Sequence, residues 1–591
     1  MSCPIADYAL LSDGETAALV SRDGCIDWLC WPRFDDDACF AALLGRSENG
    51  SWTISPAEAI KRNVRRYQDD TLVIETDFEV ADGAVRIVDF MPIGIGSRSV
   101  VRIVTGLHGI VKMRSELCLR FNYGELSPLI ERVNGAIQSY IGPDRVTLRS
   151  DIEMHVTDGV IRGSFDVRAA EAVTFVMSYG RTHEPSDEPF DIQAALHTTQ
   201  GFWRDWIANF DDSRTAWPQA VKRSLLTLKA LIYRPTGAIV AAPTTSLPEA
   251  PDGQLNWDYR YAWLRDTSFA MVALLNAGYH EEAQAWRDWL VRTVATAPER
   301  CRIMYRVDGG RHLPEWTVDW LQGHRYAKPV RIGNAAADQH QLDVLGEVID
   351  CLDVARRGGL APAGEEYFVE RRIVEHIEKV WHLPGAGIWE SRSTPKHYTY
   401  SRVMAWVALD RFVNNHVCDE GHSALAERLE SLRERLRAEI LREAWNQGLG
   451  SFTQYYGAEE VDASLLLMPL VGFISVNDPR MSSTIDRIAR DLSENGLIRR
   501  HPKDPCGPDE GTFLACSCWM ADCLNLQGRK EEARKQFERV LAVANDVGLL
   551  AEQYNIQRVE LAGNFPQALS HLAVINTALG LSGPTLQRGG G

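Results

Sequence analysis

The sequence predicts two structures in series: an antiparallel β-sandwich in the first part of the chain and a helical domain in the rest. Apolar and polar side chains alternate through about the first 200 residues, which is the period of half-buried strands. After that point apolar residues recur at the spacing of one helical face. Roughly ten helices or more, joined by long loops rich in Trp, Gly and Pro, fit an α/α barrel. Periodicity alone does not separate this barrel from a helical solenoid.

The strands of the first part are expected to be short and joined by tight turns. Residues 72–80 and 84–93 are β-prone runs joined through Asp82-Gly83, a hairpin signal. In residues 111–121 apolar side chains alternate with Lys, Arg and Glu, so this strand has one solvated face. Residues 172–179 form another strand. Many short strands with Gly and Asp turns indicate a sandwich.

The change to helical spacing begins near residue 200. Val221, Leu225, Leu228 and Ile232 form one apolar stripe, which ends at Pro235. Further helical stretches are expected at about 267–293, 336–357, 365–380, 400–440, 463–474, 480–493, 511–526, 529–546 and 566–580.

Composition excludes several classes of function. The 63 basic and 80 acidic residues give a net charge of −17, which disfavours nucleic acid and anionic membranes as partners. The longest apolar run, Ala463–Val476, is too short to span a bilayer. The first residues lack a secretory signal, and the 12 cysteines are too sparse for a disulfide framework, so we expect a cytoplasmic protein. The 15 histidines show no zinc-type spacing, and we expect no metal or cofactor.

The loop from Asn256 to Asp266 is the first candidate for chemistry. It holds two Trp, two Tyr, two Arg and two Asp, including Trp257, Tyr261, Arg265 and Asp266. Aromatic rings that stack on sugar faces and charged groups that bind hydroxyls are what a sugar pocket needs. A buried capping loop with an internal Arg–Asp pair explains the composition equally well.

Two more loops place a glutamate beside apolar or aromatic residues. Glu390 follows Trp389, and Glu552 lies in an Ala-Glu-Gln-Tyr segment. Each alone is best interpreted as an ordinary loop or helix-start carboxylate. Together they form the pair that glycoside hydrolysis requires, one acid for the leaving oxygen and one carboxylate for water or covalent attack.

Several motifs in order give the chain a resemblance to glycoside hydrolase family 15, the glucoamylase, glucodextranase and trehalase family. They extend over nearly the whole length: Asp27–Asp35, Ala241–Glu249, Tyr261–Asp266, Arg331–Asn334 with Gln339 and Gln341, Trp389-Glu390, Glu510–Phe513 and Ala551–Tyr554. Each motif is weak, but the ordered set is specific.

The resemblance implies a β-sandwich, a helical linker and an (α/α)6 barrel. We assign these to residues 1–198, 199–235 and 236–585, and expect residues 586–591 to be a disordered tail. The reaction implied is hydrolysis of an α-glucosidic bond with inversion.

The family motifs also imply residue roles. Glu390 corresponds to the general acid and Glu552 to the general base, while Arg265 and Asp266 would hold the non-reducing glucose. The aromatic residues Trp257, Tyr261 and Trp389 are candidate substrate ligands.

This sequence departs from the fungal glucoamylases directly after the acid. Ser391 stands where they carry a second acidic residue, and Arg392 is a candidate substrate ligand instead. Glu510 belongs to a motif typical of the bacterial branch, and either a sugar contact or a structural salt bridge would explain it.

The substrate prediction depends on the N-terminal aromatic loop. We expect Trp31 and Arg33 to reach over the barrel mouth and close the pocket, whereas Trp28 is better explained by core packing. A closed pocket favours trehalose or a short α-gluco-oligosaccharide, with a glucoamylase or glucodextranase acting on longer α-glucans as the alternative. A phosphorylase and a catalytically weak sugar-binding protein are further alternatives, and a homo-oligomer is left open.

Overall fold

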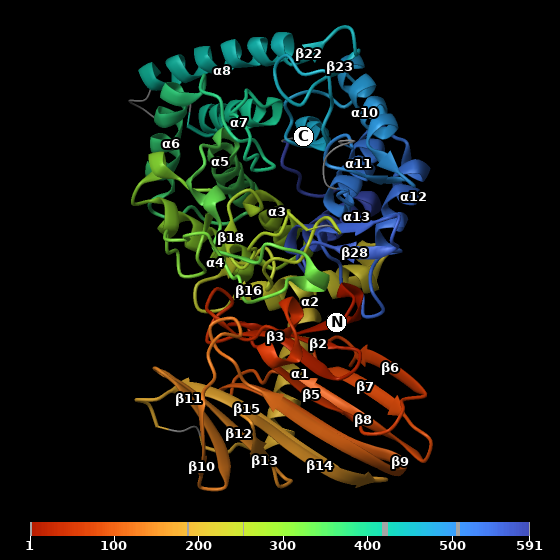
Figure 1. The fold of residues 1–591 in the computed structure, drawn as a ribbon. Helices are drawn as coiled ribbons and strands as arrows, with labels where there is room; N and C mark the ends of the chain where they lie inside the picture. Colours follow the sequence, from red (N-terminus) through yellow and green to blue (C-terminus); the bar gives the residue numbers. More distant parts are fainter. Residues whose placement is uncertain (1–2, 186–187, 252, 417–422, 504–508, 590–591) are drawn as a thin grey trace.

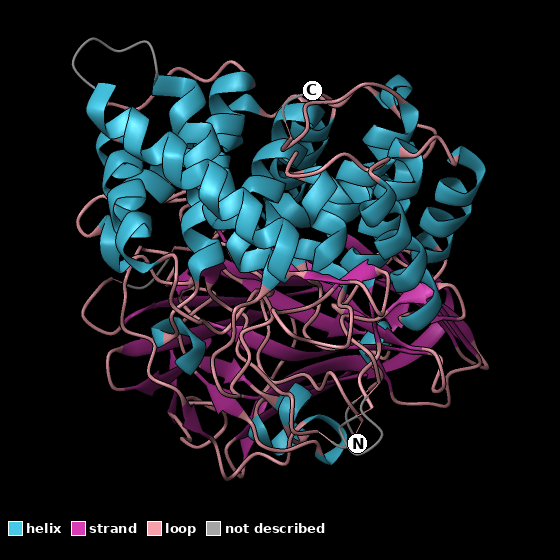
Figure 2. Cartoon of the chain, turned by 90° about the horizontal axis from the view of Figure 1, so that it is seen from above, coloured by secondary structure: helices cyan, strands magenta, loops and turns pink. Residues whose placement is uncertain are grey.

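The structure, a computed structural model, describes all residues except 1–2, 186–187, 252, 417–422, 504–508 and 590–591. Strands and helices are segregated, with the strand-rich N-terminal part on one side and the helices on the other (Figures 1 and 2). The predicted order, an antiparallel β domain followed by a helical domain, is confirmed.

The β domain is built around one long strand, β9 (Arg98–Cys118). Its first half pairs with β8 and β15, and its second half pairs with β5 and β14, so β9 passes through both halves of the sheet. Every ladder in this domain is antiparallel among the described residues. The other strands are β1 (Tyr8–Ser12), β2 (Ala17–Ser21), β3 (Cys25–Cys30), β4 (Ala38–Phe40), β5 (Ser51–Pro56), β6 (Arg62–Tyr67), β7 (Ile74–Glu79), β8 (Gly83–Phe90), β10 (Leu129–Val133), β11 (Ala136–Ile141), β12 (Asp144–Ser150), β13 (His155–Thr157), β14 (Val160–Arg168) and β15 (Ala172–Arg181).

Sequence patterns explain these strands directly. The predicted hairpin is β7–β8, and its register is antiparallel throughout. In β9, Val111 and Met113 are buried while Lys112 and Arg114 are exposed, as the alternating pattern predicted.

The helical domain is a closed ring of inner helices inside a second set of outer helices. The inner ring consists of α3 (Thr267–Ala277), α5 (Leu342–Arg357), α7 (Thr399–His416), α9 (Leu467–Leu470, preceded by a 3-10 helix), α11 (Leu514–Leu526) and α13 (Ala568–Ser582). Each packs against the next, and α13 returns to α3. The outer helices are α2 (Pro218–Leu231), α4 (His280–Val294), α6 (Glu366–Val380), α8 (Ser423–Glu443), α10 (Pro479–Asp491) and α12 (Lys530–Leu541). Ring closure decides for a barrel and against an open solenoid.

Burial follows the two rings. Almost every residue of α3, α5, α11 and α13 is buried, whereas α10 and α12 bury one face only. Helix α1 (Ile192–Ile207) precedes the ring. Helix α2, which we expected in the linker, packs against α13 as an outer helix of the ring.

Several predicted helix limits were wrong. The stretch 267–293 is two helices, because Gly278 adopts a left-handed conformation (φ 92°) and ends α3. The stretch 400–440 is also two helices, α7 and α8, and the residues between them lie outside the described part of the chain. The stretch 511–526 begins as helix only at Leu514, because Thr512–Phe513 pairs as strand β26 with β27 (Gln553–Asn555).

Short two-residue and three-residue strands organise the loops around the ring. They are β16 (Ile232–Tyr233), β17 (Ala238–Ile239), β18 (Ala262–Trp263), β19 (Met304–Tyr305), β20 (Trp316–Thr317), β21 (Arg331–Ile332), β22 (Trp445–Asn446), β23 (Ser451–Phe452), β24 (Ser493–Glu494), β25 (Leu497–Ile498) and β28 (Glu560–Ala562).

The predicted disordered tail is also wrong for residues 586–589. This segment lies among the inner helices, where the C label stands in Figure 1, and Arg588 is only 5% exposed. Ion pairs with buried carboxylates of α5 hold it in place. The last two residues of the expected tail lie outside the described residues. Within the described residues, no helix is both long and apolar enough to cross a membrane.

Candidate active site

A cavity of about 620 Å³ lies among the loops of the helical ring. It collects residues from five separate segments of the chain. They include Glu249, Trp257, Tyr259, Asn334, Trp389, Glu390, Arg392, Lys396, Tyr398, Tyr455, Arg500, His501 and Glu510. Aromatic rings, carboxylates and guanidinium groups therefore face one space, which is the composition of a sugar pocket.

Glu390 lines this cavity with a backbone in the left-handed region (φ 55°), a strained conformation for a residue with a side chain. The Gln339 amide holds that backbone by donating to the carbonyl oxygens of Glu390 and Ser391, both at 3.2 Å. The Oε1 atom of Glu390 accepts from Trp263 Nε1 at 2.8 Å and from Arg265 Nη1 at 2.9 Å. Burial raises the pKa of Glu390, and the Arg265 charge opposes this rise.

Glu552 lies deeper, with 2% of its surface exposed, just before β27. Its Oε1 accepts from the Tyr259 hydroxyl at 2.7 Å, whereas Oε2 has no hydrogen-bond partner. Burial raises the pKa of Glu552 to about 7, against the lowering effect of Arg500 and of the Tyr259 hydrogen bond. Gly563 makes room for this carboxylate, because a Cβ there would lie 2.7 Å from Oε2.

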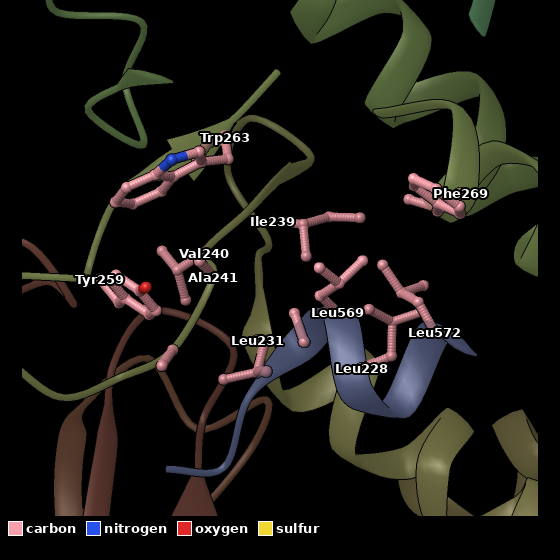
Figure 3. Close-up of a cluster of buried hydrophobic side chains, with 14 of the residues drawn as sticks. Leu228, Leu231, Ile239, Val240, Ala241, Tyr259, Trp263, Phe269, Leu569 and Leu572 are labelled. Atoms are coloured by element: carbon pink, nitrogen blue, oxygen red, sulfur yellow. The ribbon is translucent and has the colours of Figure 1, made fainter. Parts of the chain in front are cut away.

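The two carboxylates are linked through one loop. Tyr259 holds Glu552 and Trp263 holds Glu390, and the two rings meet edge to face with centroids 5.2 Å apart. Figure 3 shows both rings on the same stretch of chain, beside a cluster of buried aliphatic side chains that includes Leu231 and Ile239. The loop 256–266 therefore fixes the two carboxylates relative to each other.

Arg265 and Asp266 lie beneath the cavity lining. Arg265 Nε donates to Asp266 Oδ1 at 2.8 Å, and its Nη1 contacts Glu390. Both side chains are slightly exposed to solvent, with exposed fractions of 10% for Arg265 and 9% for Asp266. The pair can therefore orient the glutamate and present polar atoms to a bound sugar.

Tyr261, predicted as a substrate ligand, does not line the cavity. Its side chain is 4% exposed, and its hydroxyl donates to Asp258 Oδ2 at 3.3 Å. Asp258 is a buried hub that also pairs with Arg260 and accepts from the Gly333 amide. The hydroxyl of Tyr261 already has its hydrogen-bond partner in Asp258, away from the cavity, so the prediction that Tyr261 contacts the substrate was wrong.

The predicted ligands Trp257, Trp389 and Arg392 do line the cavity. Trp389 donates to Asp462 at 2.9 Å. Trp257 carries the Arg392 and Arg331 guanidinium groups over its ring, at 4.1 and 4.3 Å from the centroid. Arg392 Nη1 is fixed by Glu315 at 2.8 Å, which also lowers the pKa of Glu315.

Glu510 lines the cavity and also forms a salt bridge, so both interpretations from the sequence describe it in part. Its partner is Arg500, at 2.6 Å, which also pairs with Glu249. Sequence reasoning missed Arg500 and Tyr259 as site residues. Tyr259 stands inside the recognised loop, so its position was available, whereas Arg500 lies in no motif that we used.

Trp31 and Arg33 were predicted to close the pocket, and the structure contradicts this. Neither lines the cavity. Arg33 pairs with Asp35 at 3.1 Å and with Asp308 at 2.6 Å, so neighbouring carboxylates occupy its guanidinium group. Trp31 is 5% exposed and packs on Tyr179. Trp28 is fully buried and donates to the Pro243 carbonyl at 2.7 Å, which fits the packing role that we preferred for it.

No group of three or more His, Cys, Asp or Glu side chains that could hold a metal ion occurs within the part of the chain that the structure describes.

Comparison with known proteins gives the same organisation. Residues 217–579 match the family described as Glycosyl hydrolases family 15, and residues 1–182 match the family described as Trehalase-like, N-terminal. The chain is 34% identical to a trehalase of Thermoplasma volcanium, covering 98% of this chain and 94% of the relative. It is 35% identical to a trehalase of Mycobacterium tuberculosis, covering 98% and 89%.

A solved bacterial glucoamylase, determined in complex with acarbose, has the same fold. Its TM-score is 0.76 at 13% identity, covering 99% of this chain and 95% of that chain. At this identity the likeness concerns the arrangement of the two domains, not the substrate.

Proposed function

Because the chain belongs to glycosyl hydrolases family 15, we propose that it hydrolyses trehalose to two molecules of glucose, with inversion at the carbon that is attacked. It is a glycoside hydrolase of the trehalase type. The relatives named trehalase match it over nearly their whole length, which supports trehalose as the substrate. The observation that carries the mechanism is the pair of carboxylates held by Tyr259 and Trp263: buried Glu552 and partly buried Glu390.

Glu390 is proposed as the general acid. It lines the cavity, and burial keeps its pKa above that of a free glutamate, so a larger fraction holds a proton near neutral pH. That proton passes to the glycosidic oxygen as the bond from this oxygen to the anomeric carbon breaks. Arg265 and Trp263 fix the side chain and are therefore positioning groups for the acid.

Glu552 is proposed as the general base. Its free Oε2 can take a proton from water while the water oxygen attacks the anomeric carbon on the face opposite the leaving group. The products are one glucose with inverted configuration and one that keeps the configuration of the leaving sugar. Arg265 and Asp266 are proposed to bind hydroxyls of the attacked glucose, and Arg392, Trp257, Trp389 and Glu510 to contact the sugars from the cavity wall.

The test is glucose release from trehalose, maltose, isomaltose, maltoheptaose and soluble starch. We expect trehalose to give the highest kcat/KM, and Glu552→Gln to lose activity on every sugar. Glu531→Gln, on the exposed side of α12, is the matched control and should behave as wild type. Proton NMR of the first products should show equal amounts of both glucose anomers from trehalose.

Other outcomes would change the proposal in defined ways. Activity that rises with chain length would make the enzyme a glucoamylase. Glucose 1-phosphate formed only with added phosphate would make it a phosphorylase. Binding of trehalose without glucose release would favour the sugar-binding alternative.

A further inference from the structure

The segment Leu586–Gly589 docks onto the inner ring through its backbone. Asn276 of α3 forms two hydrogen bonds with Leu586, one to its amide at 2.8 Å and one to its carbonyl at 2.9 Å. Arg357 of α5 and Arg411 of α7 both donate to the Arg588 carbonyl, at 2.8 and 3.0 Å. The Gly589 amide donates to the carbonyl of Leu470, in α9, at 2.8 Å. Four inner helices therefore hold this segment in one register.

Glycine is required where the segment passes α9. A Cβ on Gly589 would lie 2.8 Å from the backbone nitrogen of Gly472. The two backbones approach so closely that a side chain at residue 589 has no space.

The Arg588 side chain enters the interior of the ring. Its Nε pairs with Asp350 at 2.7 Å and its Nη2 with Glu347 at 2.6 Å. The guanidinium group also lies over the Phe269 ring, 4.5 Å from its centroid. Both carboxylates are fully buried, so Arg588 brings charge to a place where an unpaired carboxylate is costly.

The carboxylates of α5 form a column through the ring. Asp343, Glu347 and Asp350 stand at i, i+4 and i+7, which is one face of a helix, and all three are buried. Asp350 has a second cation, Arg411, at 3.2 Å. Among the described residues, Glu347 has no cation within ion-pair distance other than Arg588.

Glu347 links this column to the candidate active site. It accepts hydrogen bonds from Ser268 at the start of α3 and from the Tyr400 hydroxyl of α7. Ser268 stands two residues after Asp266, in the same first helical turn, and Arg265 pairs with Asp266 and Glu390. The ion pair and the proposed sugar ligands are therefore attached to the same short stretch of backbone.

We propose that Arg588 is a positioning residue: it is the counter-ion of Glu347, and through Ser268 it fixes the start of α3 that carries Arg265 and Asp266. This inference rests on the proposed function, because it assigns those two residues to the substrate. Residues 586–589 would then help to position the substrate ligands Arg265 and Asp266, although they lie about 300 residues away in the sequence.

The test compares Arg588→Met, Arg588→Lys and the double variant Arg588→Met with Glu347→Gln. Gln587→Met is the control, because that neighbouring side chain is exposed. We expect Arg588→Met to lower kcat/KM on trehalose by about tenfold or more, measured well below its Tm. Arg588→Lys, which keeps the charge, should recover much of this loss. In the double variant we expect Tm to return toward wild type while kcat/KM stays low, because Ser268 and Tyr400 donate to different oxygens of Glu347 and a glutamine has an acceptor oxygen at only one of these positions.

A second readout does not depend on activity. Burial raises the pKa of Glu347 to about 7, and the Arg588 charge opposes that rise; Asp350, Cys351 and Tyr400 are its other titratable neighbours. Ionised Glu347 without Arg588 should destabilise the fold, so the Tm gap between wild type and Arg588→Met should widen from about pH 6 to about pH 9. The gap should not widen in the double variant.

Two results would overturn the inference. One is wild-type kcat/KM in Arg588→Met below its Tm, and the other is kcat/KM that returns together with Tm in the double variant. If Arg588→Met does not fold, the double variant decides alone. A wild-type enzyme without activity on trehalose would refute the proposed function instead, and the pH dependence of Tm would still report on the ion pair.

Discussion

Two aromatic and charged segments of this protein, residues 27–36 at the end of β3 (the first loop) and residues 256–266 (the second loop), share several residue types but have different partners. Each contains two Trp together with Arg and Asp, and each lies within a range that matches a family model. In the second loop Trp263 donates to Glu390, which lines the cavity, and Tyr259 donates to Glu552, which is buried. In the first loop Trp28 donates to a backbone carbonyl of the barrel, and Arg33 pairs with aspartates outside the cavity.

The difference teaches that composition identifies a polar, aromatic loop but not its task. A donor that reaches a carboxylate in an accessible cavity can shape chemistry, whereas a donor bound to a buried backbone carbonyl joins two domains. The first loop is therefore interpreted as the connection between the β domain and the ring, and the second as the frame of the active site. Substitutions at the glutamates that the second loop holds, within that loop and in the first loop should therefore differ in their effect on catalysis.

The largest effect is expected from the glutamates themselves. Glu390→Gln and Glu552→Gln should each lower kcat on trehalose by about a thousandfold or more, because each removes a proton-transfer group. α-Glucosyl fluoride separates them, since fluoride leaves without a proton. Glu390→Gln should keep much of the wild-type rate on this substrate, whereas Glu552→Gln should stay impaired.

The assignment of acid and base would be reversed by the opposite pattern. If Glu552→Gln hydrolyses the fluoride and Glu390→Gln does not, Glu552 is the acid. Equal, small losses of activity in both variants would mean that neither glutamate takes part in catalysis, and the two loops would then not differ in function.

A smaller effect is expected from the side chains that hold these glutamates. Tyr259→Phe removes a hydrogen bond that lowers the pKa of Glu552, so that pKa should rise above its value of about 7. A base must be ionised to act, so the acidic limb of the kcat/KM profile should move to higher pH, with a loss at pH 7 of about tenfold.

Tyr261→Phe is the matched control in the same loop. Its hydroxyl contacts Asp258 outside the cavity, so this variant should leave the acidic limb where it is in the wild type. Equal shifts in Tyr259→Phe and Tyr261→Phe would mean that the loop acts through its general packing and not through the Tyr259 hydrogen bond.

Local patterns predicted most of the fold. Alternation in residues 111–121 and the Asp82-Gly83 turn depend on neighbours along the chain, so the second half of β9 and the β7–β8 hairpin could be read directly. Ring closure could not, because it depends on α13 meeting α3 across almost 300 residues of sequence. The family resemblance supplied it instead.

The candidate site was predictable only where a motif carried it. Glu390 and Glu552 were paired from the composition of their loops and given acid and base roles from the family motifs, and those roles remain predictions. Arg33 pairs with Asp308, and Arg588 pairs with Glu347; these carboxylates are distant in sequence, and no spacing rule selects them. For that reason Arg33 was wrongly placed at the cavity and residue 588 in a disordered tail.

The smallest effect on catalysis is expected from Arg33→Ala. If the first loop only joins the domains, kcat/KM on trehalose and on maltoheptaose should stay within about twofold of wild type, because the nearest partners of Arg33 are Asp35, Asp36 and Asp308.

The free energy of unfolding of Arg33→Ala should fall by about 1–2 kcal/mol, since Asp35 is buried and would keep only Arg306 as an ion-pair partner. Burial raises the pKa of Asp35, and the Arg306 and Arg33 charges oppose this rise. The loss of stability should therefore be larger at neutral pH, where Asp35 is ionised, than in acid, where it is protonated. Thermal denaturation of wild type and Arg33→Ala at neutral and at acid pH checks this. A raised KM for trehalose with unchanged stability would instead place Arg33 at the substrate and remove the contrast between the loops.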